Sequence, residues 1–385
     1  MRVAIVGIGH SKFGKRTDVN IGELAFESIR QAVDDAGVDR KDISSVVVGS
    51  AGGWYEESLP AVVVDEYAGL TGAGSMRVEA ACASGSAALK AAYNSIVSGE
   101  GDVAMAVGVE KMTEVDTPTS VELIGRSGSY TWEFENYGMT FPAYYALYAV
   151  AHMNRFGTTE EDLSRVSVKA HHYGAMNPLA QFQKEVTLEK AMSSPVVAWP
   201  LKLYDACPLT DGSATVILAS EEKARELTDT PVWVKGIGNS TDTANLSRRP
   251  DYVGLGAAVE AANRAYAQAK VTPGDIDVAT AHDCFTIAEL MAYEDLGFCK
   301  KGEGARLIRE GETEIGGRIP VNLDGGLKAK GHPIGATGVS MAVEITKQLR
   351  NEAGNRQAPI KNGIGLVHNV GGTGHYAYVT ILSRD

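Results

Sequence analysis

Cys82 lies where a strand is expected to end and a helix to begin. The strand-like segment 76–79 precedes it, and the small residues 83–86 follow it. A thiol at a helix N-terminus is close to unpaired backbone N–H groups and to the positive end of the helix dipole, which lower its pKa below about 8.5. This setting indicates a nucleophile, although a lone cysteine is also common as a buried structural residue.

Two other segments carry imidazole groups at positions suited to chemistry. His332 lies in the glycine-rich stretch 331–338, where packing periodicity does not explain a histidine. His282 and Cys284 directly follow an expected strand at 278–280. Because functional groups in α/β sheets collect at the carboxyl ends of strands, an imidazole and a second thiol there indicate a site.

A second glycine-rich segment is suited to binding a developing negative charge. It spans 371–374 and follows Asn369 at the end of an expected strand. Backbone N–H groups in such a loop can donate hydrogen bonds to an oxyanion. The segment is therefore a candidate oxyanion site.

An internal repeat supplies the elements that position these groups. Each copy has a glycine pair at a strand end, then a helix, a turn and another strand. The first copy consists of Gly7 and Gly9, 23–36, 37–43 and 45–48. The second copy consists of Gly236 and Gly238, 257–269, 270–276 and 277–280. The two turns correspond at an offset of 233 positions.

The repeat continues through the segments that carry chemistry. Residues 82–85 open one small-residue helix and 335–338 open another, and a strand follows each. Strands that alternate with amphipathic helices predict an α/β fold with right-handed crossovers and sheets covered on both faces. The symmetry of the two helix N-termini predicts that His332 and Cys82 approach one pocket.

The segment between the two copies matches neither of them. It is rich in Tyr, Met, Phe and Trp, and we predict that it forms an inserted, mostly helical domain. We expect an N-terminal half at 1–115, completed by 201–229, a loop domain at 116–200 and a C-terminal half at 230–385.

Five segments together resemble the thiolase family, and more narrowly its archaeal and sterol carrier protein type members. They are 82–85, 205–214, the His-Asp-Cys-Phe motif at 282–285, 296–299 and 331–338. Each is weak alone, but the five in this order cover essentially the whole chain. The resemblance implies a five-layered αβαβα fold of two duplicated halves with an inserted loop domain, which agrees with the repeat.

The resemblance also implies catalytic roles. Cys82 would take the acyl group, and His332 would activate it. In the best-studied thiolases a second cysteine near the C-terminus moves the α-proton, but Asn369 stands at that position here. Thiolases with the His-Asp-Cys-Phe motif place this cysteine within it, so Cys284 would be the acid/base. His282 would join His332 in polarising a thioester oxygen.

The remaining site predictions concern the oxyanion hole and the substrate. The backbone N–H groups of Cys82 and Gly371 would form the second oxyanion hole. Met139, in a segment that resembles the thiolase loop near the acyl pocket, and Phe285 would contact substrate. Arg248 and Arg249 form the clearest exposed basic cluster and could meet the CoA phosphates, although a solvated loop is an equal alternative.

The expected function is interconversion of two acetyl-CoA with acetoacetyl-CoA and CoA, the first step of mevalonate synthesis. A Claisen condensation joins two thioesters, so one group must hold an acyl unit while another removes an α-proton. This scheme needs no metal or other cofactor. The resemblance implies a homodimer or homotetramer, and a complex with hydroxymethylglutaryl-CoA synthase through a zinc-ribbon and OB-fold protein. The alternatives are another condensing enzyme of the same fold, for longer 3-ketoacyl chains or of the synthase type, and a non-catalytic acyl-CoA-binding subunit.

Composition limits the other classes of function. The 385 residues carry a net charge of −12, which argues against a nucleic-acid partner. No apolar stretch reaches the roughly 20 residues that span a bilayer, so we expect no membrane association. Four cysteines without metal-ligand spacing favour a reduced, cytoplasmic protein. The pair Gly7 and Gly9 lacks the third glycine of a dinucleotide fingerprint, because Lys12 stands there.

Overall fold

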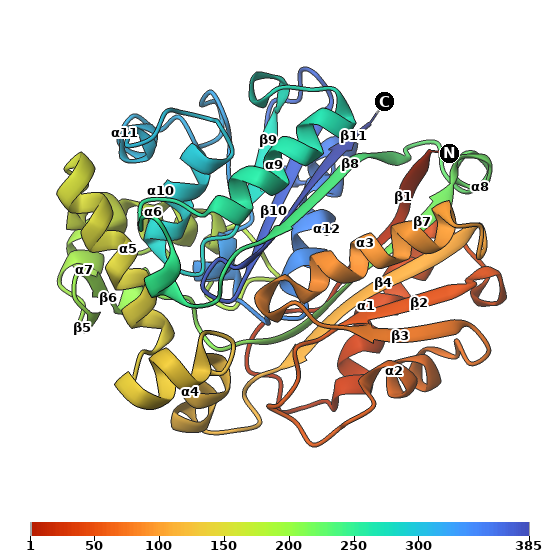
Figure 1. Cartoon of the computed structure of the whole chain (residues 1–385). Helices are drawn as coiled ribbons and strands as arrows, with labels where there is room; N and C mark the ends of the chain where they lie inside the picture. Colours follow the sequence, from red (N-terminus) through yellow and green to blue (C-terminus); the bar gives the residue numbers. More distant parts are fainter. Residues whose placement is uncertain (1, 385) are drawn as a thin grey trace.

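The computed structural model describes residues 2–384. Strands and crossover helices alternate along its first part (Figure 1). This part contains β1 (Val3–His10), α1 (Ile21–Ala36), η1 (Arg40–Asp42), β2 (Ser45–Gly49), α2 (Pro60–Ala68), β3 (Gly74–Val78), η2 (Ala81–Ala83), α3 (Ser84–Val97) and β4 (Val103–Lys111). The elements labelled η are short helical turns.

Helices dominate the chain between β4 and the next long strand, as the composition of this segment predicts. In Figure 1 the helices α4 to α7 gather on the left, away from β1 to β4. The segment contains α4 (Thr117–Gly125), η3 (Tyr130–Glu135), α5 (Phe141–Phe156), α6 (Glu160–Ala175), α7 (Leu188–Met192), β5 (Val196–Ala198), β6 (Leu201–Lys202) and η4 (Leu203–Asp205). The domain boundaries proposed at 116 and 200 stay a prediction.

The rest of the chain returns to alternating strands and helices. It contains β7 (Asp211–Ser220), α8 (Glu221–Leu227), β8 (Val232–Thr241), η5 (Leu246–Arg248), α9 (Gly256–Ala269), η6 (Pro273–Asp275), β9 (Val278–Ala281), α10 (Thr286–Asp295), α11 (Gly304–Arg309), η7 (Gly326–Lys330), α12 (Thr337–Arg350), η8 (Gly354–Arg356), β10 (Ile364–Gly371) and β11 (Tyr376–Ser383). Within residues 2–384, no helix combines the length and apolar character needed to cross a membrane.

The strand order repeats in the two halves. The nine-stranded mixed sheet has the order β3-β2-β4-β7-β1-β8-β11-β10-β9, and β1 and β8 join the halves at its middle. Outward from this junction, each half has two antiparallel pairs followed by a parallel pair. An isolated β-bridge between Ala279 and Val321 gives the second half a fifth strand position, which corresponds to that of β3 in the first half. The predicted duplication is confirmed, although the halves share one sheet.

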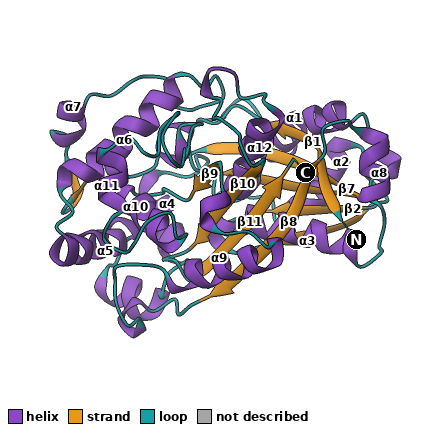
Figure 2. Cartoon of the chain, turned by 90° about the horizontal axis from the view of Figure 1, so that it is seen from above, coloured by secondary structure: helices purple, strands orange, loops and turns teal. Residues whose placement is uncertain are grey.

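Helices cover the sheet in the expected layers. In the first half α1 packs on β1 and β7, and in the second half α9 packs on β8 and β11. Helices α3 and α12 pack against each other in the middle, where α12 contacts strands of both halves. Figure 2 shows the strands enclosed by helices when the chain is seen from above.

The repeated glycine pairs are sites of close strand–helix contact. A Cβ on Gly9 would lie 1.9 Å from the carbonyl oxygen of Ser28 in α1, and one on Gly238 would lie 1.9 Å from that of Ala261 in α9. The two helix residues are 233 positions apart, the offset found in the sequence. The glycines therefore let the helix approach the strand, which explains the pattern without a dinucleotide.

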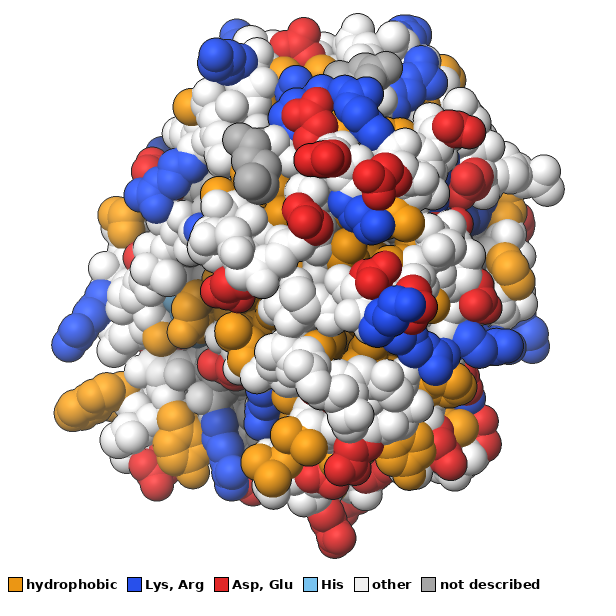
Figure 3. All heavy atoms as spheres, turned by 90° about the vertical axis from the view of Figure 1, so that its right-hand side faces the viewer, with side chains coloured by type: hydrophobic (Ala, Val, Ile, Leu, Met, Phe, Trp, Pro, Cys, Tyr) orange, Lys and Arg blue, Asp and Glu red, His pale blue; other side chains and the backbone are white. Residues whose placement is uncertain are grey.

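The surface at the right-hand side of Figure 1 has mixed charge. Figure 3 shows acidic and basic side chains interspersed with apolar ones on this face. The edge strand β3 is exposed over Gly74 to Arg77, and Met76 retains 47% of its accessible surface.

Candidate active site

Cys82 lies in the turn η2, between the edge strand β3 and helix α3. Ala81, directly before it, has φ of 50°, a left-handed conformation that costs energy for a residue with a side chain. The Ser84 hydroxyl holds the turn: it accepts a hydrogen bond from the Ala80 N–H at 2.9 Å and donates one to the Ala81 carbonyl at 2.7 Å. The thiol thus precedes the first residue of α3, as the sequence predicts.

The pKa of Cys82 differs from the prediction. Burial, with a smaller contribution from nearby Cys207, raises the pKa of this thiol to about 12. The backbone N–H groups of nearby Gly372 and of Cys82 itself act in the opposite direction. The expectation of a lowered pKa is therefore wrong, because desolvation outweighs the helix N-terminus. Cys82 is a thiol at rest and needs a base in order to react.

His332 presents an unpaired ring nitrogen. Its Nδ1 lies 2.7 Å from the Thr337 hydroxyl oxygen, and that hydroxyl donates its own hydrogen to the Pro333 carbonyl at 3.0 Å. Nδ1 must therefore carry the hydrogen of the imidazole, and Nε2 holds the lone pair. Nε2 is buried without a hydrogen-bond partner among the described residues. Burial and the charges of two lysines lower the pKa of His332 to about 3, so it is neutral and able to accept a proton.

His282 has the opposite tautomer. Its Nδ1 accepts a hydrogen bond from the Asn369 side-chain amide at 3.1 Å, so Nε2 carries the hydrogen. The same amide nitrogen donates to the Cys82 carbonyl at 3.1 Å. The ring of His282 stands nearly perpendicular to that of His332, with 5.1 Å between their centroids. Burial, with His332 and His368, lowers its pKa well below the usual value, so His282 is neutral.

Cys284 completes the cluster. Its carbonyl accepts hydrogen bonds from the Cys207 N–H at 2.9 Å and the Lys328 ammonium at 3.1 Å. Burial and the neighbouring Cys207 raise the pKa of the Cys284 thiol well above its usual value, and Cys82 raises it further. The nearby Tyr145 hydroxyl has the opposite effect. The structure therefore brings both predicted cysteines and both histidines together.

Two of these residues had no assigned role in the sequence analysis. Tyr145 comes from α5 of the insert, and its ring stacks on Phe285 at 4.6 Å between centroids. Asn369, noted only as a departure from the thiolase pattern, links Cys82 to His282. No local pattern predicts the contact of Tyr145, because it depends on how the insert packs against the second half.

The glycine-rich turn between β10 and β11 lies against the nucleophile. A Cβ on Gly371 would be 2.2 Å from the Ala80 carbonyl oxygen, so the turn packs directly on the residues before Cys82. The N–H that meets the Cys82 sulfur belongs to Gly372. The role of the Gly371 N–H as an oxyanion donor stays a prediction.

The predicted substrate residues lie in different settings. Met139 is half-buried and lines a cavity of about 470 Å³ with Tyr137 and Tyr252. Phe285 is buried under Tyr145. Their substrate contacts stay predictions.

The two arginines of the predicted basic cluster differ from each other. Arg248 is exposed, whereas Arg249 is only 7% exposed and its guanidinium donates to the Thr243 and Thr373 carbonyls. The expectation that Arg249 belongs to an exposed cluster is wrong, because the protein itself satisfies its hydrogen bonds.

A cavity of about 650 Å³ adjoins residues that contact the cluster. Cys207 and Lys328, which both bond to the Cys284 carbonyl, form part of its lining. Its other lining residues include three lysines and three rings: Lys12, Lys184, Lys190, His171, Phe182 and Tyr204. This cavity combines an apolar wall with positive charge, and two of its lining residues donate hydrogen bonds to the Cys284 carbonyl.

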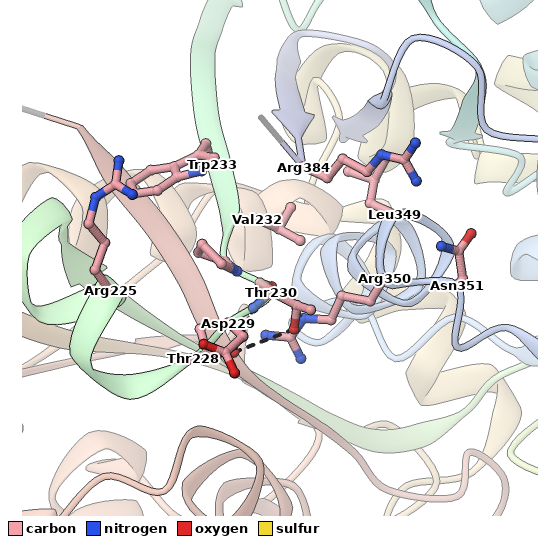
Figure 4. A pocket seen from close by; sticks show the side chains of 11 residues that line it. Arg225, Thr228, Asp229, Thr230, Val232, Trp233, Leu349, Arg350, Asn351 and Arg384 are labelled. Atoms are coloured by element: carbon pink, nitrogen blue, oxygen red, sulfur yellow. Dashed lines mark hydrogen bonds between the residues drawn. The ribbon is translucent and has the colours of Figure 1, made fainter.

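The lining of another cavity, of about 490 Å³, likewise includes none of the predicted catalytic residues. Figure 4 shows Arg225 beside Trp233 and Arg350 reaching toward Thr230 in this cavity. Arg225 pairs with Glu221 at 3.0 Å, and Arg350 pairs with Asp35 at 2.8 Å. Carboxylates already neutralise both of these guanidinium groups. We therefore assign this cavity a structural place at the junction of the two halves and not a catalytic role.

Comparisons with known proteins agree over the whole chain. The family model described as "Thiolase, N-terminal domain" matches residues 3–222, and "Thiolase C-terminal domain-like" matches 238–384. The chain is 47% identical to "Acetyl-CoA acetyltransferase" of Methanothermobacter thermautotrophicus over 99% of both chains. It is 34% identical to "Sterol carrier protein 2" of Bos taurus over 96% of this chain and 70% of that protein. A solved "Ltp2-ChsH2(DUF35) aldolase" matches with a TM-score of 0.86 and 27% identity, over 99% of this chain and 97% of the other.

Proposed function

The chain belongs to the thiolase family, and from this premise we propose its reaction and the residues that carry it out. It is an acetyl-CoA acetyltransferase, which interconverts two acetyl-CoA with acetoacetyl-CoA and free CoA. The observation that carries the assignment of residues is the buried cluster of Cys82, His332, Cys284 and His282, in which Asn369 bonds to two members. The neutral histidines with opposite tautomers suit a base and a hydrogen-bond donor.

In the first half-reaction Cys82 takes the acetyl group. The Nε2 of His332 accepts the thiol proton as the sulfur attacks the thioester carbonyl of acetyl-CoA. Backbone N–H groups of Cys82 and of the turn at Gly371 stabilise the oxyanion. The bond between the carbonyl and the CoA sulfur then breaks, and the CoA thiolate takes the proton of Cys284. The raised pKa of Cys284 suits this step, because the group must enter it protonated.

In the second half-reaction Cys284 acts as the base. Its thiolate removes the α-proton of a second acetyl-CoA, while the Nε2–H groups of His282 and of protonated His332 donate to the enolate oxygen. The enolate carbon attacks the acetyl group on Cys82, and the carbon–sulfur bond to Cys82 breaks. Cys82 then recovers its proton from His332. All protons come from the enzyme and the two thioesters, so the scheme uses no further cofactor.

Acyl-CoA would reach the cluster through the cavity of about 650 Å³. Lys12, Lys184 and Lys190 outnumber Glu185 in its lining, and this excess of positive charge suits the CoA phosphates. Exposed Arg248 is a further candidate for phosphate contact.

We also propose a homo-oligomer and a scaffold partner. The exposed edge strand β3 has unpaired backbone groups, which a second copy of the chain could cover. The name of the matched aldolase includes a DUF35 component, which supports a partner of the zinc-ribbon and OB-fold kind. Through it the chain would join hydroxymethylglutaryl-CoA synthase in mevalonate synthesis. A cytoplasmic location suits the catalytic thiols, which must stay reduced.

Intact-mass spectrometry after incubation with acetyl-CoA tests the proposal. The wild-type chain should gain one acetyl group, and Cys82→Ala should gain none. Cys299→Ala is the matched control, because this half-buried thiol lies outside the cluster and its loss should leave the adduct unchanged. An adduct that persists in Cys82→Ala would refute the nucleophile. A wild-type chain without an adduct would indicate the acyl-CoA-binding subunit instead.

A further inference from the structure

We propose that Arg249, together with Tyr148, is a positioning residue that holds the Gly371–Gly374 turn so that its Gly372 N–H stays directed at the Cys82 sulfur. The inference rests on the proposed role of Cys82. It gives Arg249 a function different from the phosphate contact that its position in the sequence suggested.

The Thr373 carbonyl is the point at which the turn is held. It accepts a hydrogen bond from Arg249 Nη1 at 2.8 Å and another from the Tyr148 hydroxyl at 2.7 Å. Arg249 Nη1 also donates to the Tyr148 hydroxyl oxygen, and Nη2 lies 3.3 Å from the Thr373 hydroxyl. A single buried carbonyl therefore receives two donors, one of them charged, and charge-assisted hydrogen bonds are the stronger kind.

The guanidinium is itself fixed from the opposite side. Arg249 Nη2 and Nε donate to the Thr243 carbonyl at 3.0 and 3.3 Å, and Asp242 lies 4.0 Å from Nε. Arg249 follows the turn η5 and Tyr148 lies on the insert helix α5, so the clamp joins two parts of the chain to the turn. A planar fork of donors suits this geometry, which a lysine ammonium cannot reproduce.

The turn needs an external clamp because it is glycine-rich. Gly372 and Gly374 have φ of 61° and 94°, a region in which other residues are strained. Three of its four residues have no side chain to anchor them. The Thr373 carbonyl lies two peptide units after the Gly372 N–H, so fixing that carbonyl limits the movement of the turn that carries this N–H. The turn packs on Ala80, two residues before Cys82, and the Gly372 N–H lowers the pKa of the Cys82 thiol.

The role predicts a specific kinetic defect. If the turn moves, the Cys82 thiolate loses a hydrogen-bond donor and forms at higher pH. A misplacement of about 1 Å in an active site costs on the order of a hundred-fold in rate. We expect Arg249→Lys to lower kcat for acylation by about ten- to a hundred-fold, with little change in KM for acetyl-CoA.

The experiment compares three lysine substitutions and Tyr148→Phe. The rate of Cys82 alkylation by iodoacetamide is measured against pH, and kcat and KM are measured for acylation by acetyl-CoA. Arg249→Lys should shift the alkylation profile to higher pH, and Tyr148→Phe should shift it less. Arg165→Lys, an exposed residue of α6 paired with Glu161, is the matched control and should change neither. Arg248→Lys should affect KM only, if it meets the CoA phosphates.

The outcomes separate this inference from the proposed function. An alkylation profile unchanged in both Arg249→Lys and Tyr148→Phe overturns the clamp, as does a change confined to KM in Arg249→Lys. If Arg249→Lys does not fold, the Tyr148→Phe profile decides, because that variant removes one hydroxyl only. Loss of acetylation in Cys82→Ala supports Cys82 as the nucleophile independently of the results for the Arg249 variant.

Discussion

Removal of the Asn369 amide should separate the catalytic role of this residue from its packing role. The side chain is fully buried and its nitrogen donates to both the Cys82 carbonyl and the His282 Nδ1, each at 3.1 Å. Asn369→Ala leaves both acceptors unpaired. A buried polar group without a partner costs about 1–3 kcal/mol, so with two such groups the free energy of unfolding should fall by about 2–6 kcal/mol.

The effect on catalysis should exceed the effect of lost stability. Without the amide, His282 is no longer restricted to the tautomer with the proton on Nε2, and the enolate loses a fixed donor. Removal of one such donor typically costs about a hundred- to a thousand-fold in kcat. We therefore expect condensation to fall by this factor, while acetylation of Cys82 falls less.

The assay for Asn369→Ala combines intact mass, steady-state condensation and thermal unfolding. Asn177→Ala is the matched control, because Asn177 is also buried and donates to a backbone carbonyl, that of Asp324 at 2.8 Å. The control should lose stability and keep kcat. If both variants lose stability and both keep kcat within a few-fold, the assignment of His282 through Asn369 is refuted.

Three further predictions follow from the same contacts. Cys284→Ser should slow condensation while single-turnover acetylation of Cys82 persists, and equal loss of both steps would contradict the division of roles. Tyr145→Phe removes the hydroxyl that stabilises the Cys284 thiolate, so the pH at which half-maximal condensation occurs should rise, and an unchanged pH profile would argue against the contact. Burial raises the pKa of Glu110 from 4.5 to about 6, so the folded state holds its proton more tightly than the unfolded state. Glu110 therefore stabilises the fold below pH 4.5, and this contribution of about 2 kcal/mol is lost as the pH rises through 6. The free energy of unfolding in urea, measured against pH, should vary less in Glu110→Gln than in the wild-type chain.

The repeat in the sequence predicted more of the fold than any single motif did. The offset of 233 positions between the copies returns as the spacing between the helix residues that face Gly9 and Gly238. Had the two copies been aligned one residue out of step, these two helix residues would not have corresponded. The edge-to-edge join of β1 and β8 was not predicted, because it involves only two residue pairs and leaves no pattern in the sequence.

The site predictions failed where the outcome depends on burial. A helix N-terminus lowers the pKa of a thiol, but at Cys82 desolvation is the larger effect, and sequence alone does not reveal how deeply a residue is buried. The same limit applies to Arg249, which looks like an exposed base beside Arg248 until Tyr148 and Thr373 surround it. Both errors concern the environment supplied by distant segments.

The approach of the two catalytic loops follows from glycine contacts at the centre of the fold. Helices α3 and α12 begin against each other: a Cβ on Gly85 would lie 2.8 Å from the Gly335 carbonyl oxygen, and one on Gly338 would lie 2.3 Å from the Ser86 nitrogen. Side chains at these positions would force the helix N-termini apart. Because Cys82 lies two residues before α3 and His332 five before α12, the same separation would move the nucleophile away from its base. The small residues after Cys82 therefore set the distance between the two halves of the site.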